Sequence, residues 1–133
     1  MGLRGRFLTG DVLDEAELER VSADGVVLHV RKLKAAVAYD HYRAPGKRFN
    51  GKRVRSSGGA LVTTGRVVLW AAGVRQLDLE RASLPTPALT VSSDADVLTV
   101  AFAAEDFHPD RSGSVTVRLW TPEATRLAEL LTR

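Results

Sequence analysis

Residues 58–71 read GGALVTTGRVVLWA, and they hold two runs of β-forming residues, 60–64 and 66–71, with the turn residue Gly65 between them. Two strands this close in sequence predict an antiparallel hairpin, because a parallel crossover needs about a dozen residues or more. Glycine within a strand is typical of a place where two backbones approach closely, and Gly58 and Gly59 open the first run. We expect this hairpin to form the centre of a β-sheet.

Further β-rich runs lie on both sides of the hairpin. The segment 26–42 contains VVLHV and AVAYDHY, which indicate one long bent strand or two short ones. Additional strands are predicted over 74–79, 88–91, 97–103 and 114–120, with a turn at 92–94. About seven antiparallel strands in so short a chain must curl into a barrel or split into two packed sheets.

Helical patterns occur near both ends of the chain. At the C-terminal end, Thr121 is a candidate N-cap and Pro122 suits the first helical position. The apolar positions that follow have the spacing of a single buried stripe: Ala124, Leu127, Ala128 and Leu131. A short helix is also predicted over 11–21, with Asp11 as its N-cap.

The length of 133 residues fits a single domain, with an N-terminal segment over 1–25 and the β-barrel and its helix over 26–133. The chain has no cysteine, which excludes disulfides, thiolate zinc sites and a cysteine nucleophile, and which fits a cytoplasmic location. No apolar stretch has the length of a signal peptide or a membrane helix. Arginine outnumbers lysine 15 to 4, which suggests a bacterial protein from a GC-rich genome.

Positive charge is concentrated in the middle of the chain. Residues 25–77 hold eleven basic residues and a single acid, Asp40. The stretch 44–58, APGKRFNGKRVRSSG, is rich in turn residues and is predicted to be a long loop, with Asn50-Gly51 as the turn of a small hairpin at its tip. Such a loop favours an anionic partner. The candidate ligand-binding residues are Lys47, Arg48, Lys52, Arg53 and Arg55.

The hairpin sequence resembles the core of pleckstrin-homology-like and GRAM-like domains, in which a glycine, a leucine, a threonine and an arginine mark the second and third strands. The matching residues are Gly59, Leu61, Thr64, Arg66, Leu69 and Trp70. The resemblance implies a seven-stranded barrel capped by a C-terminal helix, which the stretch 113–131 also fits. It further implies a loop between the first two strands that holds lipid phosphates, and Lys47, Arg53 and Arg55 match that pattern in order.

We therefore expect a non-enzymatic binding module without a cofactor, peripheral at a membrane, whose basic loop touches lipid headgroups or an acidic protein. The alternative is a protein-interaction or self-assembly module, including a homo-oligomer, that uses an exposed sheet edge in 74–92. Nucleic-acid binding, with Phe49 stacking on a base, is less favoured. The two tryptophans are expected in the core.

Sequence signals for chemistry are weak. The three histidines, His29, His41 and His108, do not have the spacing of an established metal site. The serines of the glycine-rich segments lack the nucleophile-elbow pattern, and the glycines match neither a P-loop nor a dinucleotide fingerprint. The sequence therefore favours binding over catalysis.

Overall fold

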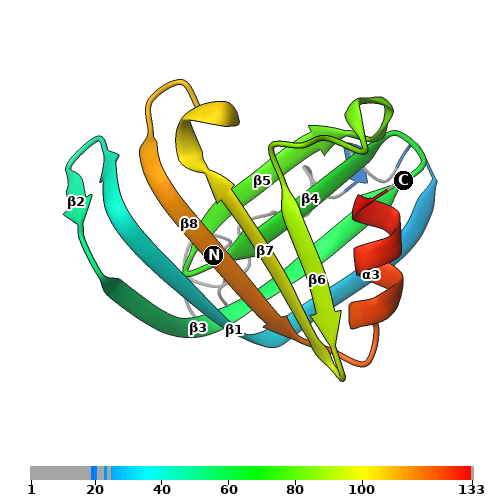
Figure 1. Cartoon of the computed structure of the whole chain (residues 1–133). Coiled ribbons are helices and arrows are strands. Elements are labelled where there is room, and N and C mark those ends of the chain that lie inside the picture. The colour runs from blue at the N-terminus through cyan, green and yellow to red at the C-terminus, as the bar shows by residue number, and fades with distance from the viewer. Residues whose placement is uncertain (1–18, 21–22, 24, 133) are drawn as a thin grey trace.

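The structure is a computed structural model that describes residues 19–20, 23 and 25–132. The fold is mainly β: an antiparallel sheet curled into a half-barrel, with one C-terminal helix (Figure 1). Its strands are β1 (Val26–Ala44), β2 (Lys47–Phe49), β3 (Lys52–Thr63), β4 (Arg66–Ala71), β5 (Val74–Glu80), β6 (Thr90–Asp94), β7 (Val97–Ala103) and β8 (Ser112–Trp120), and its helix is α3 (Ala124–Leu131). Most of the helix predicted over 11–21 lies outside the described residues.

The strands follow the order β5-β4-β3-β1-β8-β7-β6, and the short β2 also pairs with β1. Every pairing is antiparallel. The long strand β1 lies between β3 and β8, so the last strand of the chain returns to the side of the first. This arrangement places β8, which is far away in sequence, next to the β1–β3 hairpin on one curved surface.

The main core lies on the concave side of the sheet, while Leu61, Val68 and Trp70 of β3 and β4 are buried on the outward side. The inward residues of β1, β7 and β8 alternate with outward ones, as their sequence pattern predicts. The helix α3 packs beside β6 and β7 and contributes Leu127 and Leu131, both at most 1% exposed. The predicted single apolar stripe of this helix is therefore confirmed, although the helix begins at Ala124, two residues later than Pro122.

The hairpin of residues 58–71 is confirmed as β3 and β4. Gly59 lies opposite Trp70 in the register, and the Trp70 side chain is 1% exposed. A Cβ atom on Gly59 would lie 2.5 Å from Cζ2 of the Trp70 ring, and one on Gly58 would collide with the Trp70 carbonyl. Gly59 therefore leaves the space that the indole occupies, and Gly58 allows the backbones of β3 and β4 to approach each other.

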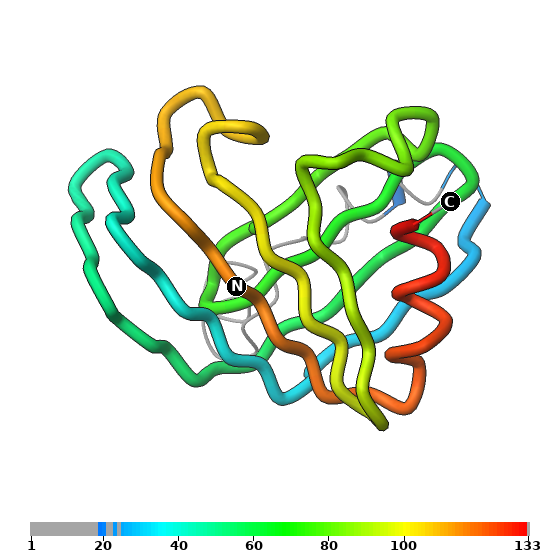
Figure 2. Tube along the Cα trace, viewed as in Figure 1, coloured from blue at the N-terminus to red at the C-terminus, as the bar shows by residue number. Residues whose placement is uncertain are grey.

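The prediction of a long loop over 44–58 was wrong. The chain turns at Pro45-Gly46, where Ala44 pairs with Lys47, and then runs back along β1 as β2 and β3. In Figure 2 the tip of this hairpin lies at the upper left, at the end of the sheet away from α3. The 19-residue β1 offers a continuous partner, and pairing with it overrides the weak β-propensity of the basic and glycine residues.

Asn50-Gly51 is not the turn of this hairpin. It interrupts the strand pairing with β1, between the Tyr42–Phe49 and Tyr39–Lys52 pairs. Gly51 has a φ of 67° and His41, on the facing part of β1, has a φ of 53°. The His41 backbone N–H donates a hydrogen bond to Oδ1 of Asn50 at 3.3 Å. A second local difference lies at 92–94, which belongs to β6, so that the chain turns at Ala95 with a φ of 53°.

Candidate functional site

Because side chains alternate along a strand, β3 sends neighbouring basic residues to opposite faces of the sheet. Arg53 and Arg55 lie opposite Ala38 and Ala36 of β1 and point outward, where both arginines are exposed. Lys52 lies opposite Tyr39, a core residue, and therefore belongs to the inward side. The structure thus separates residues that are adjacent in the sequence.

The two predicted lysines line the inner side of the hairpin tip. Nζ of Lys52 lies 4.2 Å from the centroid of the Phe49 ring, a cation–π contact. Phe49 in turn packs against Tyr39 and Tyr42, with centroid distances of 5.2 and 5.9 Å. Lys47 borders a neighbouring cavity of about 220 Å³. Phe49 is therefore an anchor in an aromatic cluster, with a lysine over its ring.

The environment of Tyr42 in this cluster changes the ionisation of its phenol. Burial raises the pKa of its phenol above the ordinary value of about 10, and the nearby Arg111 guanidinium partly opposes that effect. The phenol is 5% exposed and lies in the inner cavity beside Arg111 and Lys47. Tyr42 therefore stays neutral at physiological pH and acts as a packing residue.

Arg48 points outward near the tip of the hairpin, opposite Arg43 of β1. Of the predicted ligand-binding residues, three arginines thus share the outer face, and Lys47 and Lys52 lie on the inner side. We call the outward cations of β1, β2, β3 and β8 the basic face. Its members are Lys34, Arg43, Arg48, Arg53, Arg55 and Arg118.

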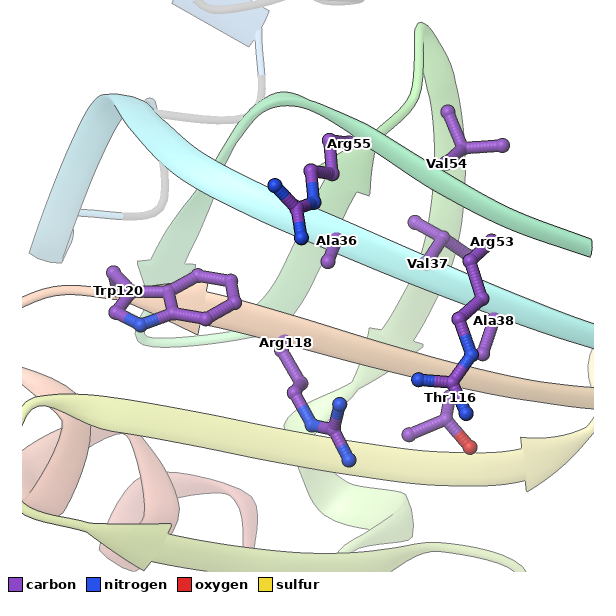
Figure 3. A pocket seen from close by; sticks show the side chains of 9 residues that line it. All are labelled: Ala36, Val37, Ala38, Arg53, Val54, Arg55, Thr116, Arg118 and Trp120. Carbon is purple, nitrogen blue, oxygen red and sulfur yellow. The ribbon is translucent and has the colours of Figure 1, made fainter.

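A groove of about 230 Å³ lies within the basic face, across β3, β1 and β8 (Figure 3). Its floor is formed by the small side chains of Ala36 and Ala38 on β1. Arg53 and Arg55 form the wall on β3. Figure 3 shows the Arg55 guanidinium over Ala36, and the Arg53 side chain reaching across β1 toward β8. The residues that line the groove from β8 are Thr116, Arg118 and Trp120.

The arginines of the groove differ from Arg66 of β4 in their partners. Arg66 of β4 forms an ion pair with Asp78 of β5 at 2.6 Å. Within the part of the chain that the structure describes, Arg53, Arg55 and Arg118 have neither an ion pair nor a side-chain hydrogen bond. Their donors are therefore open to an external acceptor.

Sequence reasoning missed two members of this groove. The alternation along β8 sends Arg118 outward, but only the register of β8 on β1 brings it beside Ala36 and across that strand from Arg55. Trp120, expected in the core, is half-buried on the outer face, with Nζ of Lys34 5.0 Å from its ring centroid. Its position in the same alternation, two residues after Arg118, is the signal that could have found it.

Other chemistry has little support among residues 19–20, 23 and 25–132. No group of three or more histidine and acidic side chains there could hold a metal ion. His108 lies 2.7 Å, through Nε2, from the backbone carbonyl oxygen of Gln76, which is a structural contact. In the same residues no helix has the length and apolar character needed to cross a membrane.

Comparison of the whole sequence with models of known protein families and with curated proteins gives no match. The basic face and its groove are therefore the features of the molecule that bear on its function.

Proposed function

We propose that the chain is a non-enzymatic binding module that holds an anionic membrane surface, through phospholipid headgroups, on its basic face. The observation that carries this proposal is the gathering of cations on one side of the sheet. Among the described residues of these strands, Asp40 is the one acid on that side, since it lies between Tyr39 and the bulge at His41 and pairs with Ser114. Each basic residue near an anionic bilayer contributes about 1 kcal/mol to binding.

The proposal includes a pleckstrin-homology-like identity and a cytoplasmic location at the membrane periphery. What supports the identity is the combination of a strand order in which the last strand pairs with the first, a C-terminal helix beside the curled sheet, and the motif over 59–70. The outward arginines Arg53 and Arg55 are also the residues that match the lipid-binding pattern of that superfold. Such a fold serves many functions, so the basic face, and not the fold, carries the argument.

Self-assembly through a sheet edge is the alternative, and the surface gives it less support. The edge strands of the described sheet are β5 and β6. Val26, at 51%, is the single large hydrophobic residue that is exposed in the described part of the chain, and it belongs to neither edge. A stable interface between copies usually has an apolar core, and neither edge offers one.

Co-sedimentation with vesicles tests the proposal, and the hairpin supplies a matched control. Arg53→Ala/Arg55→Ala removes two outward charges, and Lys47→Ala/Lys52→Ala removes two inward charges from the same hairpin. We expect the wild type to bind phosphatidylglycerol vesicles and not phosphatidylcholine vesicles, more weakly at physiological than at low salt. The outward variant should bind about 10- to 30-fold more weakly, because it loses two contacts of about 1 kcal/mol each. The inward variant should stay within about threefold of the wild type.

Circular dichroism of both variants establishes that they are folded before binding is compared. Equal losses in the two variants would mean that net charge acts without the basic face, and the proposal would fail. Absence of binding to anionic vesicles would also refute it and would direct attention to an acidic protein partner. A wild-type protein that sediments without vesicles would favour self-assembly.

A further inference from the structure

The groove contains a specific arrangement of arginines around alanines, beyond a general accumulation of charge. In the register, Arg55 of β3, Ala36 of β1 and Arg118 of β8 lie side by side across the three strands. Arg53, Ala38 and Thr116 form the next outward row. Adjacent strands lie about 4.8 Å apart, so the two arginines of the first row are separated by about 10 Å at their backbones. Two arginine side chains can span this distance, so the guanidinium groups of Arg55 and Arg118 can meet above Ala36.

The floor of the groove limits the size of what can enter. Ala36 and Ala38 contribute one methyl group each, and any longer side chain at these positions would fill the space between the arginines. The volume of about 230 Å³ lies below the roughly 300–1,000 Å³ of pockets that enclose drug-sized ligands. The groove therefore suits a small charged group that belongs to a larger molecule.

The donors around the groove select the chemistry of that group. Three guanidinium groups without partners among the described residues offer planar, forked N–H donors, and Thr116 adds a hydroxyl. A phosphomonoester presents three acceptor oxygens and a charge of about −1.5 to −2 at neutral pH, which matches several forks at once. A carboxylate presents two oxygens and one charge. The Trp120 ring already has Lys34 over it, which leaves it less suited to stack on a nucleic-acid base.

We propose that the groove over Ala36 and Ala38 is a phosphate subsite that holds the terminal phosphomonoester of a lipid headgroup between Arg55 and Arg118, with Arg53 and Thr116 as further donors. This inference rests on the membrane-binding function proposed above and adds headgroup selectivity to it. In Figure 3 the Arg118 side chain points toward β7, so it has to change rotamer to reach the phosphate. An exposed arginine without a described partner makes that change at the cost of side-chain entropy alone.

Charge-preserving substitutions separate the subsite from general attraction. Arg55→Lys/Arg118→Lys keeps both charges and removes both forks. Arg43→Lys/Arg48→Lys makes the same change on the basic face outside the groove. We expect the wild type to prefer phosphatidic acid over phosphatidylglycerol vesicles of equal surface charge by about tenfold, since charge-assisted forked hydrogen bonds are the stronger ones. Only the groove variant should lose this preference, and both variants should still bind phosphatidylglycerol.

A second variant tests the same site without touching an arginine. Ala36→Leu fills the floor and leaves every charge in place, so it should lose the preference for phosphatidic acid and keep its binding to phosphatidylglycerol. A preference that survives in both groove variants, or that never exists in the wild type, would overturn the inference while the membrane-binding function stands.

Titration with inorganic phosphate distinguishes a lipid headgroup from a free anion. Arginine side-chain NMR should show saturable shifts at Arg55 and Arg118 and not at Arg43 or Arg48. If these shifts occur but no vesicle is bound, the membrane function fails and the lipid source is overturned, and the groove is then a site for soluble phosphate. If neither shifts nor a phosphatidic acid preference occurs, the subsite itself is refuted. A preference for single-stranded nucleic acid over phosphatidic acid vesicles would also overturn the lipid source.

Discussion

Gly59 of β3 faces the indole of Trp70 on β4, and this contact couples a residue without a side chain to the largest fully buried side chain among the described residues. Within the described part of β3, Gly58 and Gly59 are the glycines whose added Cβ atom would meet Trp70. The backbone there gives no reason for glycine through a left-handed φ. Glycine is therefore needed at position 59 because a larger residue would not fit beside the indole.

Replacement of this glycine by alanine should destabilise the fold. In Gly59→Ala the new methyl would overlap the Trp70 ring, and overpacking of this kind costs about 1–3 kcal/mol in the free energy of unfolding. Urea denaturation followed by tryptophan fluorescence measures the change. Ser114→Ala, an exposed position on β8, is the control and should change stability by no more than about 0.5 kcal/mol. Equal stability of the two variants would show that the sheet relaxes around Trp70.

The raised pKa of Tyr42 makes stability depend on pH in the alkaline range. The unfolded chain releases the phenol proton near pH 10, and the folded protein holds it to a higher pH. The folded state therefore binds more protons between the two pKa values, and stability falls as the pH rises through that interval. Below about pH 9 the phenol is protonated in both states and contributes no pH dependence.

Tyr42→Phe should remove this part of the alkaline loss. We expect the urea midpoint of the wild type to fall more steeply than that of the variant between pH 9 and pH 11, roughly from the ordinary tyrosine pKa upward. Comparing the two proteins at each pH isolates the contribution of this phenol, because they differ only at this position. Parallel curves would mean that the environment of Tyr42 does not disfavour the phenolate.

At the scale of elements, strand β3 explains why the candidate site could be predicted only in part. The sequence identifies the concentration of charge, and once the segment is known to be a strand, alternation groups Arg53 with Arg55 and separates Lys52 from them. The turn residues Pro45, Gly46, Asn50 and Gly51 nevertheless predict a loop. The pairing with β1 that converts this segment into a strand is a tertiary effect, and local propensity contains no information about it.

Helix α3 depends on its buried face for stability. It has 8 residues, fewer than an isolated helix needs in water, so packing against β6 and β7 must hold it. Leu127→Ala should cost about 2–5 kcal/mol in the free energy of unfolding, because Leu127 is fully buried. Thr125→Ala, on the exposed side, is the control for the same thermal or urea measurement. A loss below about 1 kcal/mol in the leucine variant would mean that the helix is not part of the cooperative core.

At the scale of the whole molecule, the number of strands and the curled sheet could be predicted, and the arrangement on the outer face could not. Short strands and short turns imply antiparallel neighbours, and a sheet of this size must curl to bury one face. The groove instead requires the register of β3 and β8 on the two sides of β1. Arg55 and Arg118 are opposite one another only through that register, which no local pattern encodes.

The two sides of the curled sheet separate two tasks. Where β1 lies between β3 and β8, the concave side holds the apolar core and the aromatic cluster of Tyr39, Tyr42 and Phe49, and the convex side presents the basic face. Farther along the sheet, the outward side chains of Leu61, Val68 and Trp70 on β3 and β4 are buried as well. The arginines of the groove can therefore be changed without entering the core. This separation is the reason that binding and stability can be measured independently in the variants described above.

The position of β1 between β3 and β8 also has a consequence for the newborn chain on the ribosome. Residues 34–43 of β1 pair with 112–120 of β8, so one edge of the first strand lacks its partner until the last strand has been synthesised. The growing chain therefore exposes an unpaired, partly apolar strand while residues 45–111 are synthesised, and such edges invite association with other nascent chains. The basic residues on the outward sides of β1 and β3 repel the same residues of a neighbouring nascent chain. The same charges would thus keep the polypeptide apart from its own kind before it has folded.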